Sequence, residues 1–402
     1  MPTLGILKRQ KMIKVTGNIS ISKIQNLYSE LASSNDAVID VHLPKKIEKL
    51  DFGLLFSYLQ FLSTWVRNNR SGKLHLPINS SEEAIEYLKN NEFVYPSIVL
   101  AWEKEIVNAN GENIKSELKN PSKEYFNLMD SFELKGASVP IFCFDHDKSN
   151  RGLSRHLYKN YRELVNETIL SFNLYHAFKK IRITNPYVFN SSIKGSYDDF
   201  IAIIHELFTN THEHAKTNEL GHNLYPNIRA VQLKFHRKPL NKFTEQFNEH
   251  EGLVTYFNSG FKVNSQGELY LLEISILDSG PGFVKRYKNI SDYKLNISEE
   301  VEIIKQCLYR HNTSADGFRG EIKGIGLDRV LQTLDGKGFV RIKTGRADVF
   351  RDMRNNRYHH HENASEIQLN DFQNNSINNF TVYPAAEGTL LSIFYPLEFN
   401  QP

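Results

Sequence analysis

Residues 205–215 read His-Glu-Leu-Phe-Thr-Asn-Thr-His-Glu-His-Ala and predict a helix with two different faces. Because a helix advances about 100° per residue, several apolar positions fall within one narrow sector of it. This spacing is typical of a helix face that packs on a core. The positions in that sector are Ile201, Ile204, Phe208, Thr211 and Ala215. Glu206, Asn210 and His214 follow one another at i, i+4 and i+8 and form a second face. We expect this second face to be solvated or to hold a ligand.

Two glycine turns follow the helix in the sequence. The strand-like run 273–277 leads into Asp-Ser-Gly-Pro-Gly at 278–282, where an acceptor side chain precedes backbone that a ligand can approach closely. The second turn, Lys-Gly-Ile-Gly at 323–326, leads into the helical run 327–334. Because the first N–H groups of a helix are unpaired, such a turn is suited to bind an anion.

Together these motifs resemble the GHKL superfamily, which includes gyrase, the heat-shock chaperone ATPases, histidine kinases and MutL. The resemblance is carried by Glu-x-x-x-Asn-x-x-x-His-Ala at 206–215, Asp-x-Gly-x-Gly at 278–282, Gly-x-Gly-Leu at 324–327 and Gly-Thr-Leu at 388–390. It covers the second half of the chain. Each motif is common alone, but four in this order are a specific signal. The resemblance implies an ATP-binding α/β sandwich with a mixed sheet.

The resemblance also implies a role for each motif at a site for Mg–ATP. Glu206 would orient and deprotonate the attacking nucleophile. Asn210 would hold Mg²⁺ through its amide oxygen, a hard and neutral ligand. Asp278 would accept the proton of the adenine amino group, and Gly280 and Gly282 would let the backbone pass over the base.

The remaining candidates would contact the phosphates or lie near adenine. His214 would support the phosphate side or merely line the pocket, and both interpretations stay open. Thr389 would bind near adenine, usually with a water. The second glycine turn would bind the phosphates through its charge, its backbone N–H groups and the dipole of the helix that follows. Its residues are Lys323, Gly324, Ile325, Gly326 and Leu327.

Several other sites are excluded by the sequence. His205-Glu206 opens the zincin motif, but the second histidine would stand at Thr209, so the chain is not a metalloprotease of that type. A dinucleotide-binding motif fails because Arg329 replaces its third glycine, and no Walker A sequence occurs. Each proposed site residue also has an ordinary explanation, such as an exposed helix glutamate, a turn aspartate or a strand threonine.

The connection between the two glycine turns, 283–323, is longer than is usual for a loop without a function. We interpret it as an ATP lid, with 301–309 as its helix. The region 346–384 contains three consecutive histidines and little periodicity, which indicates a surface loop.

The first part of the chain predicts a separate small α/β domain. Strand-like runs at 12–16, 37–41 and 73–77 alternate with helical runs at 22–31, 52–67 and 81–89. This order resembles the STAS domains that partner anti-sigma kinases, but the expected phosphoacceptor serine is absent from 50–54. We place the domain boundary in the polar loop near residue 150, giving domains 1–150 and 151–402, with a helix at about 153–182 leading into the second.

Composition limits the classes of function. The chain has 402 residues, 40% hydrophobic and 24% charged, which predicts a folded protein of two domains. A net charge of +3 does not indicate nucleic acid as an obligatory partner. No secretory signal and no membrane span is predicted, and the two cysteines form no CxxC, so we expect a cytoplasmic protein without a zinc site.

The sequence thus predicts a Mg–ATP-binding, GHKL-like ATPase whose lid closure changes contacts with a protein partner or a second copy. One alternative is a protein serine/threonine kinase resembling the anti-sigma factor kinases. Another is a binding module in which ATP is only a sensory ligand.

Overall fold

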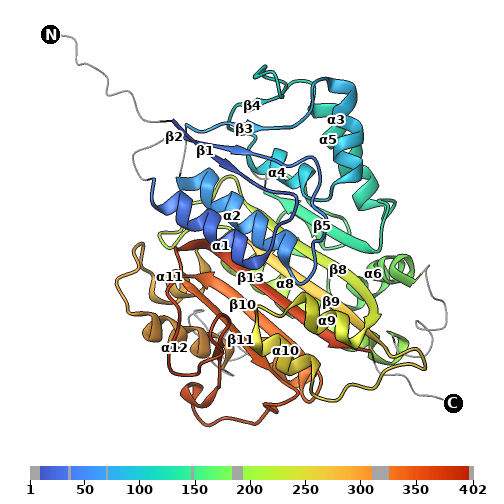
Figure 1. The fold of residues 1–402 in the computed structure, drawn as a ribbon, viewed down its shortest axis with the longest axis vertical. Coiled ribbons are helices and arrows are strands. Elements are labelled where there is room, and N and C mark those ends of the chain that lie inside the picture. Colours follow the sequence, from blue (N-terminus) through green and yellow to red (C-terminus); the bar gives the residue numbers. More distant parts are fainter. Residues whose placement is uncertain are drawn as a thin grey trace. The chain divides into compact units, whose positions relative to one another are not determined.

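The computed structural model describes residues 10–34, 38–68, 71–145, 149–182, 193–309 and 326–397. The chain divides into two compact units, an N-terminal unit (1–128) and a C-terminal unit (129–402), coloured in sequence order in Figure 1. Both units combine helices with a sheet, so the predicted α/β class is confirmed. Within the described ranges, no helix is long and apolar enough to cross a membrane.

The N-terminal unit has a four-stranded parallel sheet in the order β1-β2-β3-β4. Its elements are β1 (Gln10–Lys14), α1 (Ile21–Ala32), β2 (Val38–His42), α2 (Leu54–Asn68), β3 (Leu74–His75), α3 (Ser81–Asn90), α4 (Val94–Leu100) and β4 (Ile106–Val107). Ser20 caps α1 by accepting a hydrogen bond from the N–H of Lys23. The predicted alternation of strands and helices is therefore confirmed. The boundary between the units falls within α5 (Lys119–Asp130).

The C-terminal unit is built on a seven-stranded sheet in the order β12-β11-β10-β13-β9-β8-β5. Its strands are β5 (Ser138–Phe144), β8 (Ile228–Pro239), β9 (Glu268–Asp278), β10 (Phe339–Gly345), β11 (Ala347–Asp352), β12 (Asn370–Asp371) and β13 (Ala386–Pro396). Every neighbouring pair in this sheet is antiparallel, so the prediction of a mixed sheet is wrong.

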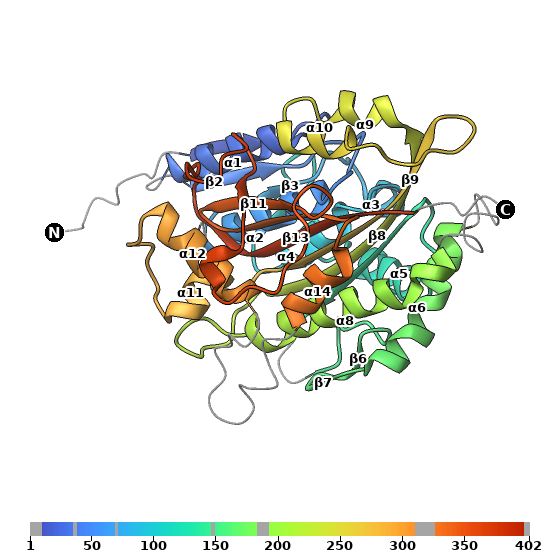
Figure 2. The same ribbon diagram turned by 90° about the horizontal axis from the view of Figure 1, so that it is seen from below.

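Helices cover both faces of this sheet, as Figure 2 shows. One face carries α6 (Glu167–Arg182), α8 (Tyr197–His214) and α14 (Gly326–Leu334), and the other carries α9 (Leu240–Gln246) and α10 (Glu251–Phe257). Two further helices, α11 (Gly282–Lys288) and α12 (Ile297–Leu308), and the short turns η2 (Lys194–Ser196) and η3 (Ala364–Glu366) complete the unit. The apolar residues of α8 join those of β8, β9, β10 and β13 in one hydrophobic core.

The division between the units lies at 128/129 rather than near residue 150. The reason is β5, which pairs along its whole length with β8 and so belongs to the sheet of the C-terminal unit. In sequence, β5 precedes the polar loop that we took as the boundary. Its partner comes more than eighty residues later, a separation that local patterns do not reveal.

Two local predictions are corrected. The helix expected from about residue 153 begins only at Glu167, because β6 (Tyr158–Asn160) and β7 (Glu163–Leu164) form a short antiparallel pair before it. The region 346–384 is not wholly a surface loop, because β11 pairs with β10 and is almost fully buried. β12 extends the sheet beyond it.

Candidate functional site

The helix α8 carries the two predicted faces. Its core face is confirmed, with each position at most 4% exposed: Ile201, Ile204, Phe208, Thr211 and Ala215. Glu206, Asn210 and His214 are half-buried on the neighbouring face. Two acidic residues occupy the first turn, where they interact favourably with the helix dipole. The rigid core face therefore fixes the direction in which the second face points.

At one end of this second face, Glu206 meets the start of α14. The Oε1 atom of Glu206 lies 3.0 Å from Nη1 of Arg329 in the first turns of α14. The same guanidinium lies 3.0 Å and 3.1 Å from the carboxylate oxygens of Glu167 on α6. These hydrogen bonds, the one to Glu167 first, raise the pKa of Arg329. A Cβ added at Gly326 would lie 2.5 Å from Oε2 of Glu206, so α14 begins in direct contact with this carboxylate.

At the other end of α8 lies the turn that follows β9. Asp278 is 8% exposed, and its Oδ1 accepts a hydrogen bond of 2.8 Å from the N–H of Gly280. The hydroxyl of Ser279 donates to Asn227 and accepts from the N–H of Ile228. The turn is therefore held on both sides, and the carboxylate of Asp278 has a fixed position.

Gly280 brings this turn against the end of α8. A Cβ at Gly280 would lie 2.6 Å from both Cα and Cβ of Ala215. Since carbon atoms normally approach to about 3.5–4.0 Å, no larger residue fits here without moving the helix. The glycine thus sets the distance between the Asp278 turn and the C-terminal end of α8.

Thr389 lies beside Asp278 because β13 and β9 are neighbouring antiparallel strands in which these two residues pair. The hydroxyl oxygens of Thr389 and Thr344 are 3.2 Å apart, and Thr344 also accepts from the N–H of Phe283. Gly388 adopts a φ of 77°, and a Cβ there would lie 1.9 Å from the carbonyl oxygen of Asp278. The Asp278 turn and the Gly388–Thr389 segment of β13 therefore form one compact group, with Gly282 against Thr344.

The middle of the α8 face is formed by Asn210 and His214. Among the described residues, no hydrogen bond of the Asn210 amide is found. Nε2 of His214 lies 4.0 Å from a carboxylate oxygen of Glu213. The described part of the chain contains no group of three or more histidine, cysteine or acidic residues that could hold a metal ion.

The second glycine turn is only partly within the described residues. Lys323, Gly324 and Ile325 lie outside them. Leu327 is half-buried and packs on the hydrophobic core. Only Gly326 of this turn is therefore seen next to the α8 face.

The first part of the expected lid, 283–309, is folded into α11 and α12. Val301, Ile304 and Leu308 of α12 belong to the hydrophobic core. Arg346 donates to the buried carboxylate of Glu300 over 2.7 Å from its Nε, which holds α12 against the turn between β10 and β11. Burial raises the pKa of Glu300, and the contact with Arg346 opposes this shift. The predicted helix is thus present, but it is packed, and the rest of the expected lid lies outside the described residues.

His212 lies on a different side of α8 and contacts residues of the β6–β7 hairpin region. Its Nδ1 is 3.2 Å from the hydroxyl of Tyr158, and its Nε2 is 3.1 Å from the carbonyl oxygen of Arg162. Burial, together with the nearby charge of Lys216, lowers the pKa of His212 to about 4. Burial likewise lowers the pKa of Lys216 to about 8. His212 is thus a neutral structural residue at neutral pH.

Sequence reasoning missed three residues of this arrangement. Arg329 meets both Glu206 and Glu167 across more than a hundred residues of sequence, and no local spacing indicates these contacts. Thr344 could have been found only from the register of β10 and β13, which pairs it with Thr389.

No protein-family model, no curated protein and no solved structure matches this chain.

Proposed function

We propose that the C-terminal unit binds Mg–ATP in the manner that its resemblance to the GHKL superfamily implies, and that it hydrolyses ATP slowly. The observation that carries this proposal is that two glycine turns contact the helix region of α8, one at each end of the stretch 206–215. Gly280 approaches Ala215 at one end, and Gly326 approaches Glu206 at the other. The intervening face bears Asn210 and His214.

The Asp278 end suits a purine base. An ionised carboxylate is an acceptor only, which matches the amino group of adenine. The hydroxyls of Thr344 and Thr389 lie beside it and can hold a bridging water. Gly280 and Gly282 supply backbone without side chains where the flat base would lie. This arrangement supports adenine as the recognised base.

The Glu206 end suits the terminal phosphate. In hydrolysis a water oxygen attacks the γ-phosphorus, the water gives its proton to Glu206, and the bond from phosphorus to the β–γ bridging oxygen breaks to leave ADP. Arg329 fixes the carboxylate of Glu206 from the side of α14. Mg²⁺, held by Asn210 and phosphate oxygens, would neutralise charge on the phosphates. The backbone and charge of Lys323 to Leu327 would complete the phosphate contacts.

In this proposal, nucleotide binding closes the lid predicted at 283–323, and this closure changes the contacts of the chain with a protein partner or a second copy. The kinase alternative rests on the Asn210-to-Ala215 motif and the STAS-like order of the N-terminal unit. The sensor alternative needs only the binding site.

The fate of γ-labelled ATP separates these possibilities. We expect label in free phosphate, and we expect Glu206→Gln to lower its release by on the order of 10²–10⁴-fold while ATP still binds. Asp198→Asn is the matched control, because Asp198 is an exposed acid in the first turn of the same helix. Label on a protein would favour the kinase, and label that stays in ATP would favour the sensor. Wild-type turnover by Glu206→Gln would contradict the catalytic assignment.

A further inference from the structure

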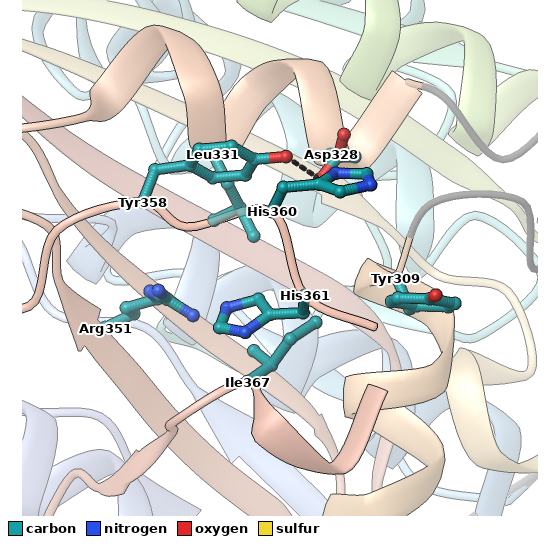
Figure 3. Close-up of a pocket in the computed structure, with 8 residues that line it drawn as sticks. All are labelled: Tyr309, Asp328, Leu331, Arg351, Tyr358, His360, His361 and Ile367. Atoms are coloured by element: carbon teal, nitrogen blue, oxygen red, sulfur yellow. Dashed lines mark hydrogen bonds between the residues drawn. The ribbon is translucent and has the colours of Figure 1, made fainter. Parts of the chain in front are cut away.

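A pocket in the C-terminal unit is lined by residues from several elements (Figure 3). It is formed by the start of α14, the end of α12, the strand β11 and the chain that follows β11. The residues that line it are Tyr309, Asp328, Leu331, Arg351, Tyr358, His360, His361 and Ile367. The pocket has room for about one atom of the size of a water oxygen, about 10 Å³.

Arg351 projects into this pocket with two of its nitrogens unsatisfied. The side chain is 1% exposed, and Nη2 donates to the carbonyl oxygen of Arg357 over 3.3 Å. Within the described ranges, Nε and Nη1 have no acceptor. A buried charge without acceptors is costly, because it has lost its hydration and gained nothing in return. Burial accordingly lowers the pKa of Arg351.

The carboxylates in the neighbourhood are already engaged. Asp335 accepts two hydrogen bonds, of 2.8 Å and 2.9 Å, from Arg357. Asp328 accepts a hydrogen bond of 2.9 Å from the hydroxyl of Tyr358, drawn as a dashed line in Figure 3. It accepts a second hydrogen bond, of 2.7 Å, from the side-chain amide of Gln332. Neither carboxylate supplies the two missing acceptors of Arg351.

His361 supplies a further unsatisfied atom at the same place. Its Nδ1 lies 3.5 Å from Oε2 of Glu366, and its Nε2 is buried without a partner among the described residues. In Figure 3 the guanidinium of Arg351 points toward the ring of His361. The pocket therefore brings two unsatisfied nitrogens of Arg351 close to a third unsatisfied nitrogen, Nε2 of His361.

We propose that this pocket binds a small oxyanion, a phosphate or a carboxylate, with one oxygen seated between Arg351 and His361. The planar guanidinium matches the paired oxygens of such an anion. The pocket has room for one oxygen of such an anion, about 10 Å³. This proposal does not depend on nucleotide binding, since Arg351 does not contact the face of α8.

The test is the stability of the full chain in different anions. Urea unfolding is measured at fixed pH and ionic strength, first in a buffer of bulky sulfonates and then with added phosphate, acetate or chloride. The variants are Arg351→Met and the control Arg357→Gln, which removes an exposed guanidinium six residues away that does not line the pocket. Anion that binds only the folded state stabilises it in a saturable way.

We expect phosphate, acetate or both to stabilise the wild type and Arg357→Gln. Arg351→Met should bind the same anion on the order of tenfold more weakly or worse, since a hydrogen bond to a charged group is lost. In sulfonate buffer Arg351→Met should be at least as stable as the wild type, because an unpaired buried charge is gone. Response to phosphate alone or to acetate alone identifies the source of the oxyanion.

The proposal is overturned if Arg351→Met responds like the wild type, if no anion gives a saturable response, or if chloride acts as strongly as the oxyanions. Should Arg351→Met fail to fold, Arg351→Lys replaces it, because lysine keeps the charge and loses the planar fork. Movement of the His361 ring resonances on addition of the oxyanion to the wild type is then required. Unmoved His361 resonances overturn the proposal.

Discussion

Gly280→Ala tests the close approach on which the site is built. The added Cβ would lie 2.6 Å from Cα and Cβ of Ala215 and 3.0 Å from Oδ1 of Asp278. Ordinary carbon contacts begin at about 3.5 Å, so α8 and the turn must separate by roughly 1 Å. The φ of Gly280 is not in the left-handed region, so the backbone itself accepts alanine. The clash with Ala215 is therefore the main cost.

Overpacking of this kind costs about 1–3 kcal/mol. Alanine also reduces the conformational entropy of the unfolded chain, which stabilises the folded state by about 0.4–1 kcal/mol. We therefore expect Gly280→Ala to lower the free energy of unfolding by about 1–2 kcal/mol and to weaken ATP binding, because Asp278 moves away from the α8 face.

The assay is urea unfolding of the full chain beside Gly195→Ala. Gly195 has no heavy atom within 4 Å of an added Cβ and no positive φ, so its replacement should change stability by less than about 0.5 kcal/mol. If Gly280→Ala proves as stable as Gly195→Ala, the contact between the turn and α8 is refuted.

Two further predictions concern buried charges of the C-terminal unit. Burial, helped by Arg341, lowers the pKa of His250 to about 4, whereas the unfolded chain titrates near 6.5. The unfolded state thus binds more protons between these two pH values, so the free energy of unfolding should fall by up to about 3 kcal/mol from pH 6.5 toward pH 4. Urea unfolding of His250→Gln should show a weaker fall. Asp348 holds Arg341 through hydrogen bonds of 2.8 Å and 2.6 Å in a fully buried pair. Asp348→Asn should therefore cost about 3–5 kcal/mol by the same measurement, and a loss below 1 kcal/mol would contradict the importance of this pair.

The parts of the site that follow local periodicity were predictable from the sequence. The two faces of α8 come from a spacing of 3.6 residues, and the core face is buried as expected. The Asp278 turn follows a strand, as the run 273–277 indicated. These features depend on neighbours within a few residues, which is the range that sequence patterns describe.

The unpredicted parts depend on distant partners. β11 carries Asp348 and Arg351 and looks polar, yet it is buried because Asp348 pairs with Arg341 across the strands. β5 belongs to the C-terminal unit only through its pairing with β8. The contact of Arg329 with Glu206 and Glu167 likewise joins three separate helices. Partners of this kind are chosen by the tertiary fold, so no local spacing reveals them.

Calorimetric titration of the full chain with Mg–ATP tests the central claim most directly. The wild type should bind ATP, and Asp278→Asn should bind on the order of tenfold more weakly or worse, because an amide presents a donor as well as an acceptor to adenine. The matched control is Asp352→Asn, since Asp352 also accepts a hydrogen bond from the N–H two residues later, at Arg354, but lies at the end of β11. Asparagine can still accept from the N–H of Gly280, so the turn should remain folded. Binding by the wild type and Asp352→Asn with loss in Asp278→Asn is the predicted result. No binding by the wild type, or equal binding by Asp278→Asn, would contradict the account.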